Sequence, residues 1–230
     1  MQSEHAATAT IDGIRGVVVD IEGTTSATSA VHVGLYGYAR PRLASWLHAH
    51  ADDPEIAAAI EATRRDAGLV AGATLDDVAS ALEAWMDGDI KATPLKTVQG
   101  QIWAAGFEDG QLTSHVFDDV PPALQGWVEN EIHLAVFSSG SVASQRPWFR
   151  HSNHGDLSPL FEAYFDTVNA GPKREPIAYD RIADELTGRW SCTVSELLFL
   201  SDVPAELDAA AQAGWLTVGL RRNGEPYGEA

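Results

Sequence analysis

The stretch Val17-Val18-Val19-Asp20-Ile21-Glu22-Gly23-Thr24-Thr25 decides the fold of this chain. Its β-branched run is typical of a strand that is buried on both faces inside a parallel sheet. Asp20 and Glu22 follow two positions apart, so on an extended chain they leave the same face. In open α/β sheets, ligands bind at the carboxyl edge where such a strand ends. We therefore expect the two acids to share a hard cation there, one of them also attacking a substrate or relaying protons. For this stretch alone, a strand followed by a solvated turn is the alternative interpretation.

Composition restricts the classes of protein that fit. The chain has 230 residues, of which 45% are hydrophobic and 21% charged, and this suits one elaborated domain or two small ones. A net charge of −18 argues against binding nucleic acid or an acidic membrane, since both need a basic face. The single cysteine, Cys192, allows no internal disulfide. Residues 1–11 lack a signal-peptide pattern, and no segment approaches the roughly 18 apolar residues of a membrane span. We therefore predict a soluble cytoplasmic protein.

The part of the chain that follows the first strand has helical patterns and no convincing strand. Apolar residues recur there at helical spacing, and prolines stand where a first helical turn tolerates them. The candidate helices are 39–47, Pro54–Asp66, Thr74–Met86 and Pro94–Ala105. We expect a small helical cap domain at 29–115, inserted into a core that 1–28 and 116–230 form.

From Val116 onward, strand and helix patterns alternate. Such alternation indicates parallel βαβ units with right-handed crossovers. The first strand is expected at about 14–20, and the later ones at His133–Phe137, Tyr164–Asp166, Leu197–Leu200 and Leu216–Leu220. The helices between these strands are expected to begin near 121, 141, 175 and 204. The predicted fold class is therefore α/β, a doubly wound, Rossmann-like parallel sheet with an inserted helical cap.

Three further segments have the chemistry of a phosphate site. Ser138-Ser139-Gly140-Ser141 lies between a strand and a helix, where hydroxyls and free N–H groups can hold phosphate oxygens, although a plain capped turn would have the same sequence. Lys173 precedes a helix and offers a point charge for a phosphoryl group, whereas Arg174 is expected to point elsewhere. Asp202 ends another buried strand, where it can cap the helix that begins at Pro204, a role that is compatible with metal binding.

The order of these segments resembles the haloacid dehalogenase superfamily of phosphohydrolases. Three of them are more specific, because Asp20-Ile21-Glu22-Gly23-Thr24-Thr25, Phe137–Val142 and Phe199–Val203 look like the enolase-phosphatases of methionine salvage. Most of the superfamily has Asp where this chain has Glu22. The segment Leu95–Trp103 also resembles the cap of that family, while Ser26-Ala27-Thr28 replaces an expected threonine-proline pair.

The resemblance implies a role for each matching residue. Asp20 would take the phosphoryl group as an aspartyl phosphate, Glu22 would act in acid–base catalysis, and Lys173 would hold the phosphoryl oxygens. Ser138 and Ser139 would bind the substrate. Mg²⁺ would lie between Asp20, Asp202 and the backbone carbonyl of Glu22. The implied reaction converts 2,3-diketo-5-methylthiopentyl 1-phosphate to an acireductone and phosphate.

Two alternatives remain open from the sequence. The chain could be a phosphatase of the same fold that acts on another small phosphate ester. It could also be a non-catalytic protein that binds a phosphorylated metabolite, although Asp20, Lys173 and Asp202 are all present. The expected partner is a small phosphorylated diketone, and a monomer is expected.

Overall fold

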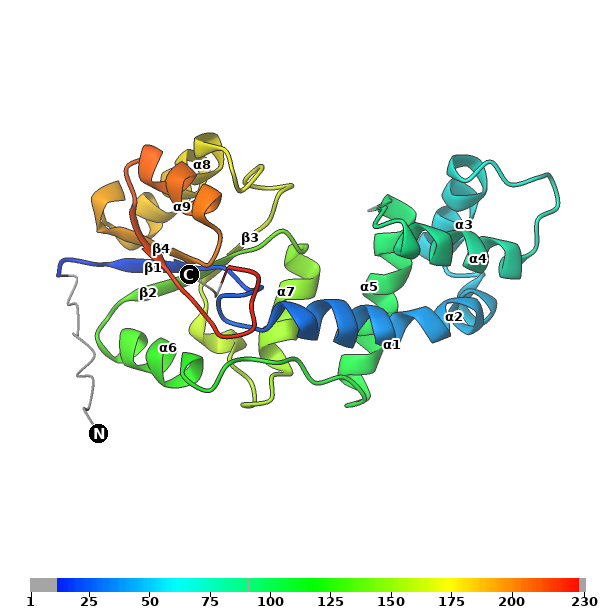
Figure 1. Cartoon of the computed structure of the whole chain (residues 1–230), viewed down its shortest axis with the longest axis horizontal. Coiled ribbons are helices and arrows are strands. Elements are labelled where there is room, and N and C mark those ends of the chain that lie inside the picture. The colour runs from blue at the N-terminus through cyan, green and yellow to red at the C-terminus, as the bar shows by residue number, and fades with distance from the viewer. Residues whose placement is uncertain (1–11, 91, 228–230) are drawn as a thin grey trace. The chain divides into compact units, whose positions relative to one another are not determined.

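The computed structural model describes residues 12–90 and 92–227 (Figure 1). They form two compact units. The first, the α/β unit, comprises 12–24, 122–139 and 160–227, and the second, the helical unit, comprises 25–121 and 140–159. Residues 1–11, for which the absence of a signal peptide was predicted, lie outside the described part of the chain.

The α/β unit is built on one parallel sheet in the order β3-β2-β1-β4-β5. Its strands are β1 (Gly16–Val19), β2 (His133–Phe137), β3 (Ala163–Phe165), β4 (Leu197–Ser201) and β5 (Leu216–Gly219). This order confirms the predicted doubly wound sheet. The chain moves outward from β1 to β2 and β3, then returns to place β4 on the other side of β1. The sheet therefore has its topological switch point between β1 and β4, where ligands bind in such folds.

The central strand β1 is buried on both faces, as its β-branched run predicts. Val17, Val18 and Val19 are each at most 1% exposed. The helices α8 (Pro176–Trp190) and α9 (Pro204–Gln212) lie on one side of the sheet, and α6 (Val120–Glu129) lies on the other (Figure 1). Val18 packs under α8 and α9 in an aromatic core whose largest members are Phe137, Tyr179, Trp190, Phe199 and Trp215.

The helical unit has its own apolar core, formed by residues from Ala39 to Ile102. Its helices are a π-helical stretch Ala30–Tyr36, α1 (Gly37–Ala39), a 3-10 turn Arg40–Arg42, α2 (Leu43–His50), α3 (Pro54–Asp66), α4 (Leu75–Asp87), α5 (Thr93–Glu108) and α7 (Val142–Arg150). Local sequence signals start two of them, since Asp53 caps α3 ahead of Pro54 and Thr74 forms a capping box with Asp77. Two further 3-10 turns are Ser158–Leu160 and Val194–Glu196. The first spans the boundary in the sequence between the two units, and the second belongs to the α/β unit.

The structure has no strand among its described residues between β1 and β2, which confirms the helical insertion. The helical unit also takes in 140–159, because α7 packs on α5 through an edge contact between Phe107 and Trp148, whose ring centroids are 6.4 Å apart. The predicted limits of 29–115 leave that segment out, and the division into a phosphatase core and a cap stays a prediction. None of the helices described is long and apolar enough to cross a membrane.

Candidate active site

The candidate site lies at the carboxyl edge of the sheet, within the α/β unit. Asp20 directly follows β1, Ser138 follows β2 and Asp202 follows β4. Backbone bonds continue the sheet past the strand ends: Asp20 donates its N–H to the carbonyl of Leu200 at 3.0 Å, and Ser138 donates to that of Phe165 at 3.2 Å. Because the strands are parallel and in register, residues far apart in the sequence meet at one edge.

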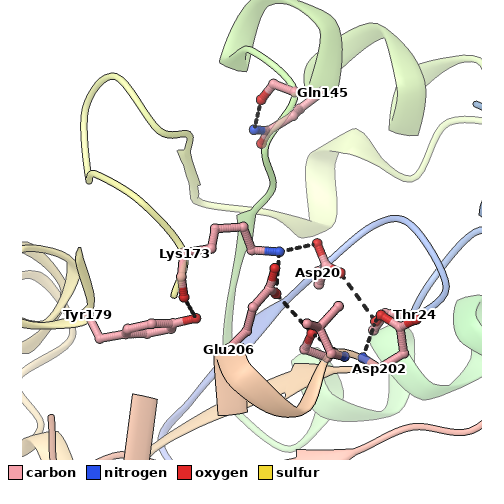
Figure 2. Close-up of polar contacts among 10 residues, drawn as sticks. Asp20, Thr24, Gln145, Lys173, Tyr179, Asp202 and Glu206 are labelled. Carbon is pink, nitrogen blue, oxygen red and sulfur yellow. Dashed lines mark hydrogen bonds and ion pairs between the residues drawn. The ribbon is translucent and has the colours of Figure 1, made fainter. Parts of the chain in front are cut away.

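The side chain of Lys173 bridges two carboxylates at this edge (Figure 2). Its Nζ lies 2.6 Å from Oδ1 of Asp20 and 2.6 Å from Oε2 of Glu206. Lys173, Asp20 and Glu206 are all buried. A buried ammonium needs such partners, since leaving one charge unpaired in the interior is costly. The arrangement fixes the cation directly beside the predicted nucleophile.

Aromatic side chains lie close to Lys173. Its Nζ lies 5.6 Å from the ring centroid of Phe137 and 5.8 Å from that of Phe199. Tyr179 donates a hydrogen bond from its hydroxyl to the Lys173 carbonyl at 2.8 Å. Burial alone would lower the pKa of Lys173, but the carboxylates of Asp20 and Glu206 outweigh it and raise the pKa above its usual value. The lysine therefore stays a cation at neutral pH.

Thr24 connects the loop after β1 with the loop after β4. Its hydroxyl accepts a hydrogen bond from the Asp202 backbone N–H at 3.0 Å. The same oxygen lies 3.5 Å from Oδ2 of Asp20 and 3.5 Å from Oδ1 of Asp202. Gly23 lets these loops approach each other, because its φ is +73° and a Cβ there would lie 2.1 Å from Oδ2 of Asp202.

Asp202 is a carboxylate whose charge is poorly compensated. Burial and the neighbouring charge of Asp20 raise its pKa to about 6. Two buried carboxylates on adjacent strands repel each other unless a cation lies between them. The carboxylates of Asp20 and Asp202 at this edge of the sheet are oxygen donors of the kind that a hard divalent cation binds.

The oxygen donors at this edge fit Mg²⁺, because two carboxylates can bind the ion while other oxygen atoms complete its coordination. Among the described residues, no three His, Cys, Asp or Glu side chains form a group that could hold a metal on their own. Mg²⁺ does not require such a cage, since it keeps several waters and takes oxygens from a substrate phosphate. Asp20 and Asp202 can supply two ligands, and the backbone carbonyl of Glu22 can supply a third.

The other predicted residues occupy nearby positions of the same unit. Glu22 lies half-buried on the turn after β1, Ser138 is buried, and Ser139 is exposed. Arg174 is exposed and makes no hydrogen bond or ion pair within the described chain, as expected of the residue beside Lys173. These placements are compatible with the roles that the resemblance implies, which stay predictions.

Glu206 is a member of the candidate site that the sequence analysis does not predict. It lies in the first turn of α9, four positions after Asp202, and Ser201 donates a hydrogen bond to its Oε2 at 3.0 Å. An acid in the first turn of a helix usually only complements the helix dipole. Only the fold, which places Lys173 beside α9, shows its second contact.

Comparison with known proteins agrees with this geometry. A family model described as haloacid dehalogenase-like hydrolase matches residues 14–214. Enolase-phosphatase E1 of Saccharopolyspora erythraea is 56% identical over 216 residues, which are 94% of this chain and 89% of the relative. That of Pseudomonas aeruginosa is 46% identical, over 92% of this chain and 91% of the relative. The chain belongs to the enolase-phosphatase E1 group of haloacid dehalogenase-like hydrolases.

Solved structures extend the likeness to three dimensions. The UTR4 protein of Saccharomyces cerevisiae superposes with a TM-score of 0.77 at 27% identity, covering 94% of this chain and 92% of that one. A dehalogenase matches at a TM-score of 0.53 and 16% identity, over 95% of this chain and 90% of that one, and shows the fold alone.

Proposed function

We propose that the chain is a Mg²⁺-dependent enolase-phosphatase that converts 2,3-diketo-5-methylthiopentyl 1-phosphate to the acireductone and inorganic phosphate. The observation that carries the proposal is the buried Asp20, which Lys173 contacts at 2.6 Å at the switch point of the sheet, beside the second carboxylate, Asp202. Phosphoryl transfer needs a positioned nucleophile and neutralised charge, and this arrangement has both.

The first half of the reaction is a proton transfer. The carbon that carries the phosphate ester is adjacent to a carbonyl group, so loss of its proton gives an enolate that the diketone stabilises. A carboxylate within reach can take that proton and return it to the enolate oxygen. We assign this transfer to Glu22, whose extra methylene gives it more reach than an aspartate at the same position.

The second half is phosphoryl transfer. A carboxylate oxygen of Asp20 forms a bond to phosphorus while the ester oxygen leaves with the enediol, and water then hydrolyses the aspartyl phosphate to regenerate Asp20. Lys173 neutralises the phosphoryl oxygens from its anchored position between Asp20 and Glu206. Ser138 and Ser139 orient the phosphate. When bound, Mg²⁺ supplies charge neutralisation at the phosphoryl oxygens and at the developing enolate.

The partners and setting of the enzyme are part of the same proposal. The substrate is a small phosphorylated diketone, neither nucleic acid nor membrane is a partner, and the enzyme acts as a monomer in the cytoplasm. The net charge of −18 and the absence of any second cysteine beside Cys192 support this setting. Light scattering after size-exclusion chromatography tests the monomer.

The deciding experiment measures phosphate release from the methylthio diketo phosphate and from a generic aryl phosphate, with and without Mg²⁺. Metal-dependent turnover that strongly favours the diketo substrate is the expected result. Turnover of the aryl ester alone would keep the fold and nucleophile but move the chain to another phosphate ester. No phosphate from either would leave only the binding of a phosphorylated metabolite.

A further inference from the structure

The segment after β5 contacts the catalytic loop. Leu220 donates its backbone N–H to the carbonyl of Ser201 at 3.0 Å. This hydrogen bond extends the pairing of β5 with β4 by one residue beyond the end of β5. Arg222 then donates from its Nε to the carbonyl of Thr24 at 2.5 Å. In Figure 1 this red segment runs beside the blue loop that follows β1.

A turn of the same segment orients the backbone of Arg222. Glu225 donates its N–H to the Arg222 carbonyl at 3.1 Å, and Glu225 is only 8% exposed. Arg222 is itself partly buried, whereas its neighbour Arg221 is exposed and has no hydrogen bond or ion pair with the described residues. Of the two adjacent arginines, Arg222 is the one that contacts Thr24.

The contact is placed where it controls the candidate metal site. Thr24 accepts the hydrogen bond from the Asp202 N–H, and its hydroxyl lies 3.5 Å from carboxylate oxygens of both Asp20 and Asp202. Thr24 is also the last residue of the α/β unit before the chain enters the helical unit. Holding its carbonyl adds a second anchor to the end of this loop, beside the hydrogen bond that Thr24 accepts from Asp202.

We infer that Arg222 is a positioning residue, which clamps Thr24 and thereby sets the spacing of the Asp20 and Asp202 carboxylates for Mg²⁺. The inference rests on the metal site of the proposed function. A residue that orients metal ligands through a neighbour typically changes metal affinity by about 10- to 100-fold when it is removed. Arg222 does not contact the substrate in this assignment.

The sign of the effect separates positioning from charge. If Arg222 acted only through its positive charge, Arg222→Ala would strengthen Mg²⁺ binding, because a cation near the site repels the metal. Positioning predicts the opposite, a roughly tenfold loss of affinity. Arg221→Ala is the matched control, since it removes the same charge one residue away and leaves the Thr24 contact intact.

The experiment is calorimetric titration of Mg²⁺ into the full chain and its variants, with circular dichroism and thermal unfolding to check folding. We expect weaker binding in Arg222→Ala and no such loss in Arg221→Ala. Unchanged or stronger binding in Arg222→Ala overturns the inference. If Arg222→Ala does not fold, Arg222→Met, which keeps the aliphatic stem, answers the same question. Absence of Mg²⁺ binding by the unaltered chain would instead refute the metal site itself.

A double-mutant cycle with Thr24→Val tests the route of the effect. Valine keeps the shape of threonine but removes the hydroxyl that accepts from Asp202. If Arg222 acts through Thr24, the double variant loses hardly more Mg²⁺ affinity than the more damaging single variant, because both break one connection. Additive losses would show that Arg222 acts by another route and would overturn the assignment.

Discussion

The ammonium of Lys173 is equidistant, at 2.6 Å, from a carboxylate oxygen of Asp20 and one of Glu206. The proposed nucleophile, Asp20, and the proposed assisting cation, Lys173, are therefore held together with Glu206 as a triad rather than as a pair. Glu206 contributes the anchoring contact that does not compete with chemistry at Asp20.

Replacing Glu206 by Gln should weaken catalysis while keeping the shape of the side chain. Lys173 then has only Asp20 as an anionic partner, and its pKa falls because one of the two carboxylates that raise it is lost. We expect kcat to fall about tenfold and the alkaline limb of its pH profile to move to lower pH. Asp208→Asn, an exposed acid on the same helix, is the control. An unshifted alkaline limb would contradict the triad.

Replacing Gly23 by Ala should damage the metal site specifically. The new Cβ would lie 2.1 Å from Oδ2 of Asp202, and the residue would also have to keep a φ of +73°. Gly13→Ala is a matched control, since its φ is +81° with nothing within 4 Å, so it shares the backbone strain of about 1 kcal/mol without the clash. Titration should show Mg²⁺ affinity lowered by at least about tenfold in Gly23→Ala alone. Equal effects of the two substitutions would refute the close approach as the cause.

Replacing Glu22 by Asp should separate the two halves of the reaction. The shorter side chain keeps the carboxylate but loses the reach that proton transfer requires. We expect turnover of the diketo substrate to fall roughly 100-fold, and hydrolysis of an aryl phosphate to fall much less. Glu175→Asp, at an exposed glutamate ahead of α8, controls for the chemical change. Equal losses on both substrates would remove Glu22 from the enolisation step.

The stability of the metal-free protein should depend on pH through Asp202. Its pKa is raised from 3.8 to about 6, so the folded state binds the proton more tightly than the unfolded state. Stability is then highest below pH 4 as far as this group is concerned, and up to about 3 kcal/mol is lost as the pH rises through 6. Denaturant unfolding at pH 4 to 7, in a chelator, should show this loss in the unaltered protein but not in Asp202→Asn. A difference between the two proteins that does not change with pH would contradict the raised pKa.

Much of the fold follows from local sequence signals, and the site follows only in part. The strand His133–Phe137 and the helix Pro54–Asp66 have the bounds that the sequence predicts, because an apolar run and an Asp-Pro start are local features. The meeting of Asp20 with Lys173 follows from parallel topology, which alternating elements predict. Glu206 and Arg222 had no such signal. Their roles depend on which side chains a distant segment places beside them, and periodicity carries no information on that.

The central strand of the sheet is the first to be synthesised, and its neighbour β4 is among the last. The hydrogen bond between Thr24 and Asp202 joins residues 178 positions apart. During translation, the acids after β1 therefore leave the ribosome long before Lys173 and Asp202 exist to compensate or complete them. Arg222 follows later still. Through most of its synthesis the nascent chain has neither the anchored cation Lys173 nor Asp202, the proposed second metal ligand. The candidate site is therefore completed only when the last few elements have been made. A chain that ends before β4 has an unpaired edge on β1, and such an edge can pair with another chain and lead to aggregation.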